Sequence, residues 1–167
     1  LIPGPVSAEV ISQACEGMVQ EARDLVRIAD NVVVKIPCIA EGLKAVKILA
    51  AERIRTNVTL VFSLGQALLA ARAGASYVSP FIGRLDDIGE DGVQLVRDMV
   101  KVFHNYNFKT EIIAASVRNA EHVNQVMLAG ADIATIPTKV LAELIQHELT
   151  DKGLAKFMED YRNSLKK

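Results

Sequence analysis

The residue with the clearest chemical potential is a lysine inside an apolar run. Lys35 lies in Val32-Val33-Val34-Lys35-Ile36-Pro37, a segment typical of a strand buried in a parallel sheet. A charged and unpaired lysine is costly there, so we expect the neutral amine to be favoured. A neutral amine attacks carbonyl carbons and forms Schiff bases. The alternative is a lysine at a strand end that reaches solvent or pairs with a carboxylate.

A glutamate occupies a similar position in the run Val6-Ser7-Ala8-Glu9-Val10. Side chains alternate between the faces of a strand, so Ser7 and Glu9 share one face. On an inner face, Glu9 could hold a catalytic water or act as an acid/base. The alternative is a structural ion pair with Lys35.

Asn57 and Thr59 also lie two residues apart, in the run Thr56–Phe62, and Ser79 lies in the run Ser76–Phe81. Amide and hydroxyl groups on one strand face can position a water or a substrate hydroxyl. For Thr59, a hydrogen bond to the backbone is the competing interpretation.

Two arginines follow predicted strands. Arg84 follows Ser79-Pro80-Phe81-Ile82-Gly83, and Arg118 follows Ala115-Ser116-Val117 just before a helix that Asn119 is placed to cap. Guanidinium groups, hydroxyls and the free N–H groups of a helix N-terminus together favour a phosphate site. Alternatively, both are surface arginines paired with Asp86 or Glu121.

The composition narrows the possible functions. Half the residues are apolar, 23% are charged and the net charge is −1, which gives no sign of a nucleic-acid or membrane-binding surface. No apolar run approaches the ~20 residues of a membrane span, and no signal peptide is visible. We expect a cytoplasmic protein with buried, reduced cysteines at positions 15 and 38. The three histidines show no metal spacing and receive no role: His104, His122 and His147.

The elements that must position these residues alternate along the chain. The predicted strands are Pro5–Ile11, Asn31–Pro37, Thr56–Phe62, Ser76–Phe81, Glu111–Ala115 and Asp132–Ile136. The predicted helices are Ala14–Ala29, Ala40–Arg53, Leu64–Ala73, Asp91–Asn105, Asn119–Ala129, Lys139–Gln146 and Thr150–Leu165. Gly74 and Gly130 each follow a helix at a position that favours a left-handed residue.

Repeated strand–helix units favour a single α/β domain over residues 1–167 with a parallel sheet. A doubly wound sheet and a (β/α)8 TIM barrel both fit. No Gly-x-Gly-x-x-Gly follows the first strand, which weakens the dinucleotide-binding option. Six units are two short of the eight that close a filled barrel, so we expect the first two units of a barrel to be missing.

Five segments in this order resemble the transaldolase family. They are Val6–Val10, Val33–Pro37, Thr56–Ser63, Ser79–Arg84 and Ala114–Arg118. Most similar are the short bacterial and archaeal transaldolases, a group that includes fructose-6-phosphate aldolase. The resemblance implies a (β/α)8 barrel and a class I aldolase mechanism without a metal or organic cofactor.

The resemblance also implies a role for each candidate residue. Lys35 would form the Schiff base, while Glu9 and Thr59 would hold a catalytic water. Asn57 and Ser79 would contact the dihydroxyacetone portion of the substrate. Arg84, Ser116 and Arg118 would bind phosphate. Fructose-6-phosphate aldolases carry tyrosine and glutamine at the positions of Phe81 and Glu9, so the chain sides with transaldolase.

The implied reaction moves a dihydroxyacetone unit from a ketose phosphate, such as sedoheptulose 7-phosphate or fructose 6-phosphate, to an aldose phosphate in the pentose phosphate pathway. The C-terminal helix, about residues 150–165, resembles one that packs on a neighbouring subunit in ring-shaped homo-oligomers, decamers or pentamers. The family's Leu-Asp-Thr and Thr-Thr-Asn-Pro motifs are not in this sequence. Free aldol cleavage and a non-catalytic truncated barrel therefore stay open as alternatives.

Overall fold

The computed structural model describes residues 2–166 and contains one parallel sheet. Its six strands lie in the order in which they occur along the chain. They are β1 (Val6–Glu9), β2 (Val32–Pro37), β3 (Thr56–Val61), β4 (Tyr77–Pro80), β5 (Glu111–Ala114) and β6 (Ile133–Ala134). Each pairs in parallel with the next, as the repeated units predicted.

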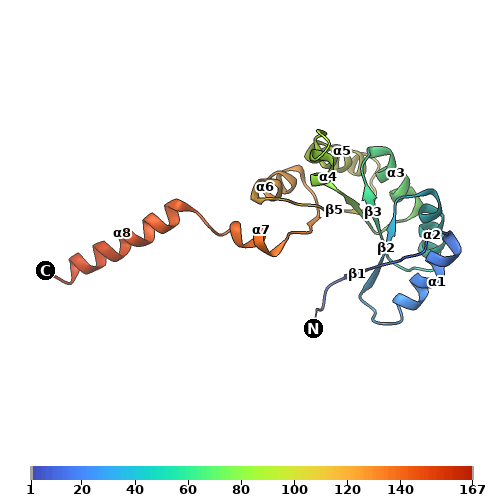
Figure 1. The fold of residues 1–167 in the computed structure, drawn as a ribbon, viewed down its shortest axis with the longest axis horizontal. Helices are drawn as coiled ribbons and strands as arrows, with labels where there is room; N and C mark the ends of the chain where they lie inside the picture. The colour runs from blue at the N-terminus through green and yellow to red at the C-terminus, as the bar shows by residue number, and fades with distance from the viewer. Residues whose placement is uncertain (1, 167) are drawn as a thin grey trace.

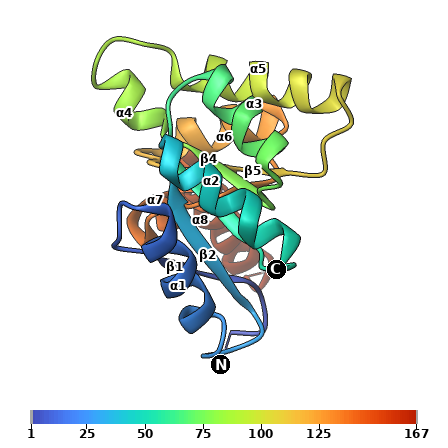
Figure 2. The same ribbon diagram turned by 90° about the vertical axis from the view of Figure 1, so that its right-hand side faces the viewer.

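Helices connect the strands and lie along the outer side of the curved sheet (Figures 1 and 2). They are α1 (Cys15–Leu25), α2 (Ala40–Ala51), α3 (Leu64–Ala73), α4 (Ile82–Asp86), α5 (Gly92–Asn105) and α6 (Ala120–Ala129). A doubly wound sheet requires a reversal of strand order and helices on both faces. The described strands show no such reversal, so the sheet is part of a barrel-like wall.

The main core lies between the sheet and these helices. Val34 and Ile36 of β2 point outward and are fully buried with Met18 of α1 and Leu49 of α2. The alternate residues of the strands face inward, where Val33, Tyr77 and Ile113 form a small second cluster. Apolar packing is thus concentrated on the outer face, and polar residues are left for the inner one.

Local signals in the sequence set several helix ends. Gly74 and Gly130 adopt left-handed conformations, with φ of 98° and 88°, at the C-termini of α3 and α6. The side chains of Asp91 and Asn119 accept backbone N–H groups at the N-termini of α5 and α6. The predicted glycine ends and the Asn119 cap are confirmed.

Other boundaries were predicted wrongly. The first helix ends at Leu25 rather than residue 29, because the N–H groups of Arg27 and Ile28 bond three residues back and tighten the chain into a turn. The last strand keeps only two residues, Ile133 and Ala134, since only β5 pairs with it. The short helix α4 was not predicted. It forms where the N–H of Ile82 bonds to the carbonyl of Ala115.

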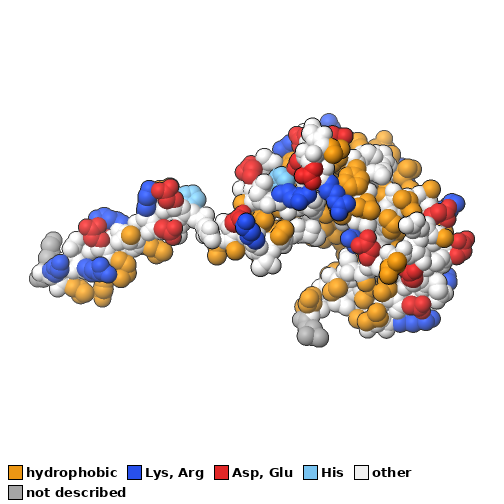
Figure 3. Space-filling view, in the orientation of Figure 1, with side chains coloured by type: hydrophobic (Ala, Val, Ile, Leu, Met, Phe, Trp, Pro, Cys, Tyr) orange, Lys and Arg blue, Asp and Glu red, His pale blue; other side chains and the backbone are white. Residues whose placement is uncertain are grey.

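Two helices extend away from the sheet at the C-terminal end: α7 (Thr138–Glu143) and α8 (Glu148–Ser164) (Figure 1). Within the described residues α8 buries no side chain. Leu154, Phe157, Met158 and Tyr161 form an exposed apolar stripe at helical spacing, visible along one side of α8 in Figure 3. Among residues 2–166, no helix combines the length and apolar character that crossing a membrane requires.

The loop after β1 is held by a glutamate of α1, and this contact predicts a pH dependence. Glu21 accepts the Ser12 hydroxyl and the backbone N–H of Ile11, at 2.6 Å, and these bonds lower the pKa of the Glu21 carboxyl below its ordinary value of 4.5. Its contribution to the free energy of unfolding is therefore complete above pH 4.5 and is lost as the pH falls through the folded-state pKa.

Urea unfolding between about pH 3 and pH 6 checks this expectation. Glu21→Gln should reduce the loss of stability on acidification, while Glu16→Gln, an exposed neighbour on the same helix, should leave it unchanged. Equal pH dependence in the Glu21 variant and the parent protein would show that the contact does not contribute.

Candidate active site

The strand register brings three polar side chains to one level of the inner face. Glu9 of β1 pairs with Lys35 of β2, and Lys35 pairs in turn with Asn57 of β3. In a parallel sheet, residues in register point to the same side, so the three groups lie beside one another. The sequence predicted each of them separately, and the sheet brings them together.

The lysine and the glutamate are in direct contact. Lys35 Nζ lies 2.9 Å from Glu9 Oε2, and their side chains are 27% and 49% exposed. The ion-pair alternative therefore describes the geometry correctly. The ion pair does not exclude a catalytic role for Lys35, because both side chains line the same cavity. Lys35 points inward, away from the helices that cover Val34 and Ile36.

The amide of Asn57 is held in a fixed orientation. Its Oδ1 accepts the Ser79 hydroxyl at 2.8 Å, and its Nδ2 donates to the Ser7 hydroxyl at 3.3 Å. Asn57 and Ser79 are buried, with 4% and 3% exposure. A row of oriented polar groups thus runs from Ser7 to Ser79 beside the Lys35 amine, suited to hydroxyl groups of a ligand.

Thr59 lies two residues beyond Asn57 and is fully buried. By strand alternation it shares the inner face with Asn57. Its hydroxyl has no hydrogen-bond partner within residues 2–166, so the predicted alternative of a bond to the backbone is wrong. Buried hydroxyl groups rarely remain unpaired, so Thr59 Oγ1 can serve a ligand or a water.

The side chains of Glu9, Lys35, Asn57 and Ser79 line a cavity of about 300 Å³ on the inner face of the sheet, and Thr59 is not among its lining residues. Residues from β1 to the end of β6 line it: Ser7, Glu9, Lys35, Asn57, Ser79, Phe81, Ala115, Ser116 and Thr135. Thr135 was not predicted as a site residue, since a lone threonine after a short strand carries no distinctive pattern. The volume is at the lower end of the range for small-molecule sites.

Ser116 lines this cavity, whereas Arg84 does not line it and instead contacts Phe81, which does. The Arg84 guanidinium lies over the ring of Phe81, with its Cζ 4.8 Å from the ring centroid. Ser116 has a left-handed backbone, with φ of 60°, and its carbonyl accepts the N–H of Gly83 at 3.2 Å. A Cβ on Gly83 would lie 2.3 Å from that carbonyl, so glycine is required for the close approach of α4.

Arg118 is held at the surface by a different acid from those predicted. Its Nη2 lies 2.8 Å from Asp87 Oδ2, whereas the sequence suggested Asp86 or Glu121. Asp86 instead contacts His122, with 3.1 Å between Oδ2 and Nε2. The sequence gives no sign of this contact of His122, because it depends on two helices that approach only in the folded chain. The Arg118 side chain does not line the cavity in this arrangement.

Two other features carry less chemistry. Burial raises the pKa of the Cys15 and Cys38 thiols, which disfavours the reactive thiolate. A hollow of about 500 Å³ lies at the opposite ends of the strands, near Phe103 and Phe108. Its Asp132 already accepts the backbone N–H of Ile112 at 2.8 Å. Neither feature matches the inner-face cavity as a candidate active site.

Comparisons with known proteins agree with the resemblance seen in the sequence. The family described as Transaldolase/Fructose-6-phosphate aldolase matches residues 1–167. A probable transaldolase of Caldicellulosiruptor saccharolyticus is 58% identical over all of this chain and 77% of its own length. One of Lactiplantibacillus plantarum is 60% identical, with 97% of this chain and 75% of the relative covered.

Solved structures with a similar fold are much more distant in sequence. Inosine 5'-monophosphate dehydrogenase from Legionella pneumophila gives a TM-score of 0.61 at 18% identity, covering 83% of this chain and 45% of that one. GMP reductase from Trypanosoma brucei gives 0.59 at 18% identity, covering 81% and 30%. This chain thus spans less than half of either protein. At such identities the likeness concerns the fold alone.

Proposed function

Because the chain belongs to the transaldolase/fructose-6-phosphate aldolase family, we propose that it carries the Schiff-base site of a transaldolase. The observation that supports this most directly is the contact between Lys35 Nζ and Glu9 Oε2, at 2.9 Å, on the wall of a cavity lined by polar groups. A lysine amine with an acid/base beside it is the arrangement that carbonyl addition requires.

The first half of the reaction breaks a carbon–carbon bond. Glu9 accepts a proton from Lys35, and the neutral amine attacks the ketone carbon of fructose 6-phosphate or sedoheptulose 7-phosphate. Water leaves and an iminium forms. Glu9, having given its proton to the departing water, then takes the proton of the hydroxyl on the fourth carbon. The bond between the third and fourth carbons breaks, and its electron pair enters the iminium to give an enamine. An aldose phosphate departs.

The second half reverses these steps with another aldehyde. The enamine attacks the carbonyl carbon of an acceptor such as erythrose 4-phosphate, the new hydroxyl takes a proton, and water releases the product from Lys35. Glu9 and Thr59 would hold this water. The fully buried Thr59 hydroxyl, which lacks a partner within the described residues, supports that assignment.

Other residues in the cavity or beside it would bind the two ends of the sugar. Asn57 and Ser79 suit the hydroxyls of the dihydroxyacetone portion, because their mutual hydrogen bond fixes both groups. Arg84, Ser116 and Arg118 would bind the phosphate, with Arg118 exchanging Asp87 for the substrate anion. No metal or organic cofactor takes part in this scheme.

Transfer and free aldol cleavage differ in their need for an acceptor. The resemblance implies tyrosine and glutamine at positions 81 and 9 in fructose-6-phosphate aldolases. This chain has Phe81 and Glu9 instead, which supports the transfer reaction. Turnover of fructose 6-phosphate should therefore depend strongly on an added aldose phosphate. Equal turnover without an acceptor would assign the chain to the cleaving branch.

We further propose that the six strands form part of a (β/α)8 barrel and that α8 packs on a neighbouring copy in a homo-oligomer. The consecutive strand order supports the first proposal. The exposed stripe of Leu154, Phe157, Met158 and Tyr161 supports the second, since an apolar helix face is stabilised by a partner.

Borohydride trapping tests the central assignment. Reduction of the purified protein in the presence of fructose 6-phosphate should add a three-carbon unit to the peptide that contains Lys35. Peptide mass spectrometry locates the modified residue. Modification of another lysine, or none, would remove Lys35 from its proposed role.

A further inference from the structure

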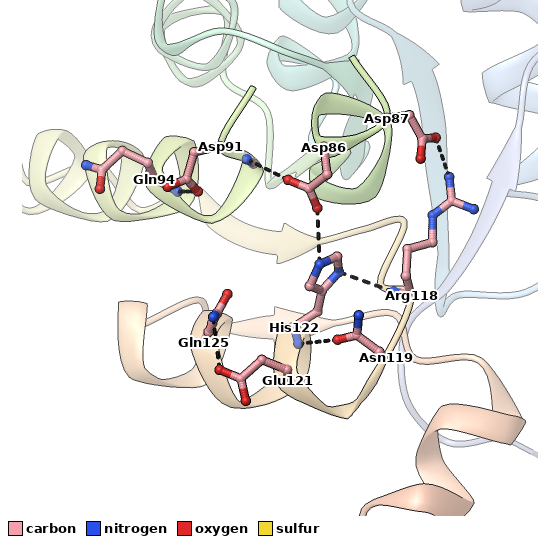
Figure 4. A network of polar contacts seen from close by, with 10 residues as sticks. Asp86, Asp87, Asp91, Gln94, Arg118, Asn119, Glu121, His122 and Gln125 are labelled. Atoms are coloured by element: carbon pink, nitrogen blue, oxygen red, sulfur yellow. Dashed lines mark hydrogen bonds and ion pairs between the residues drawn. The ribbon is translucent and has the colours of Figure 1, made fainter. Parts of the chain in front are cut away.

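A hydrogen-bonded chain outside the cavity connects the two segments that carry the arginines (Figure 4). His122 of α6 contacts both of them. Its Nε2 lies 3.1 Å from Asp86 Oδ2 in α4, and its Nδ1 accepts the backbone N–H of Arg118 at 3.3 Å. Asp86 Oδ1 accepts the N–H of Gly92 at 3.1 Å, at the start of α5.

The pattern defines which imidazole nitrogen carries the proton. Nδ1 receives a backbone N–H, so the hydrogen of the neutral ring must be on Nε2, where it donates to the Asp86 carboxylate. Both nitrogens are then satisfied. The His122 side chain is only 15% exposed, so solvent competes weakly for these bonds.

The placement of His122 relates it to the phosphate end of the site. Asp86 lies two residues after Arg84 on the same short helix, and the second bond of the imidazole fixes the backbone of Arg118 itself. A five-residue helix is weakly stable by itself, so its position depends on such tertiary contacts. His122 therefore constrains the distance between the two arginine-bearing segments.

We propose that His122 is a positioning residue that sets the relative placement of Arg84 and Arg118 for a substrate phosphate. This inference rests on the proposed function, in which both arginines bind the phosphate. Two guanidinium groups that bind the same phosphate tolerate little displacement relative to each other, so loss of the imidazole should weaken anion binding. It should leave the Lys35 end of the cavity intact, because the hydrogen bonds and the ion pair of His122 involve no residue that lines the cavity.

The test separates phosphate binding from Schiff-base formation. His122→Ala should raise the KM for fructose 6-phosphate and the inhibition constant of inorganic phosphate in parallel, each by about 10-fold, with kcat within about threefold of the parent. The concentration of dihydroxyacetone, which has no phosphate, that half-saturates borohydride trapping at Lys35 should change by less than about twofold. His104→Ala, on exposed α5 surface, is the matched control and should match the parent in all three.

Conservative variants guard against a general loss of structure. His122→Asn keeps an acceptor for the Arg118 N–H, and His122→Gln keeps a donor for Asp86, so each should recover part of the phosphate affinity. Equal losses with phosphorylated and unphosphorylated ligands, or unchanged phosphate inhibition in all three His122 variants, would overturn the positioning role. Absence of trapping at Lys35 in the parent protein would instead refute the proposed function.

Discussion

Lys35→Ala is expected to lower kcat/KM for ketose phosphates by at least about 10³-fold, because no other group in the cavity can form the iminium. The nearest polar neighbours are a carboxylate, an amide and hydroxyls: Glu9, Asn57, Ser7 and Ser79. None of these forms a nitrogen–carbon double bond with a ketone. The ion pair with Glu9 is partly exposed, and such pairs contribute little to stability, so the fold should tolerate the substitution.

Two measurements check this prediction. Steady-state assays with donor and acceptor sugar phosphates give the kinetic loss, and intact-mass analysis after borohydride reduction should show no adduct. Lys47→Ala, which removes an exposed lysine from α2, is the control and should retain full activity. Residual trapping in the Lys35 variant would mean that the reactive amine lies elsewhere.

The second large effect is expected from Glu9→Leu, which should lower kcat by about 10²-fold or more. The leucine can neither accept the proton of Lys35 nor hold a water near it. The kcat of Glu9→Gln should lie between those of the parent protein and Glu9→Leu, since the amide still forms hydrogen bonds but takes up no proton. The resemblance to the family implies glutamine at this position in fructose-6-phosphate aldolases.

Rates of donor consumption with and without an acceptor aldose phosphate measure both changes. Glu111→Leu, at the exposed start of β5, is the control for replacing a strand glutamate by an apolar residue. Parent-like turnover in Glu9→Leu would show that the contact with Lys35 is only structural. A gain of acceptor-independent cleavage in Glu9→Gln would link this residue to the choice of reaction.

The sequence predicted those parts of the fold that are encoded within one segment. The helix Leu64–Ala73 was placed correctly at both ends, because Ser63 caps its start and Gly74 supplies the left-handed residue at its end. The parallel pairing of six strands followed from apolar runs separated by helices, whereas these runs allowed both a doubly wound and a barrel-like strand order. Lys35 and Glu9 stood out because a charged residue interrupts an apolar strand.

What the sequence did not predict depends on contacts between distant segments. Helix α4 is fixed by the backbone of Ala115 and Ser116, more than 30 residues further along the chain. The pairing of Arg118 with Asp87 and of His122 with Asp86 follows from the way α4 meets α6. Local propensity contains no information about that approach. From the sequence, His122 with its partner Asp86 therefore cannot be distinguished from an exposed histidine without a partner.

The alternation of β2 has a consequence for how this protein can change. Val34 and Ile36 support the helical layer, whereas Lys35 between them faces the cavity. Mutations at position 35 can therefore change the reaction with little effect on folding. Mutations at positions 34 and 36 can change thermal stability with little effect on substrate binding. Evolution, or a protein engineer, can select for the two properties almost independently within a single six-residue strand.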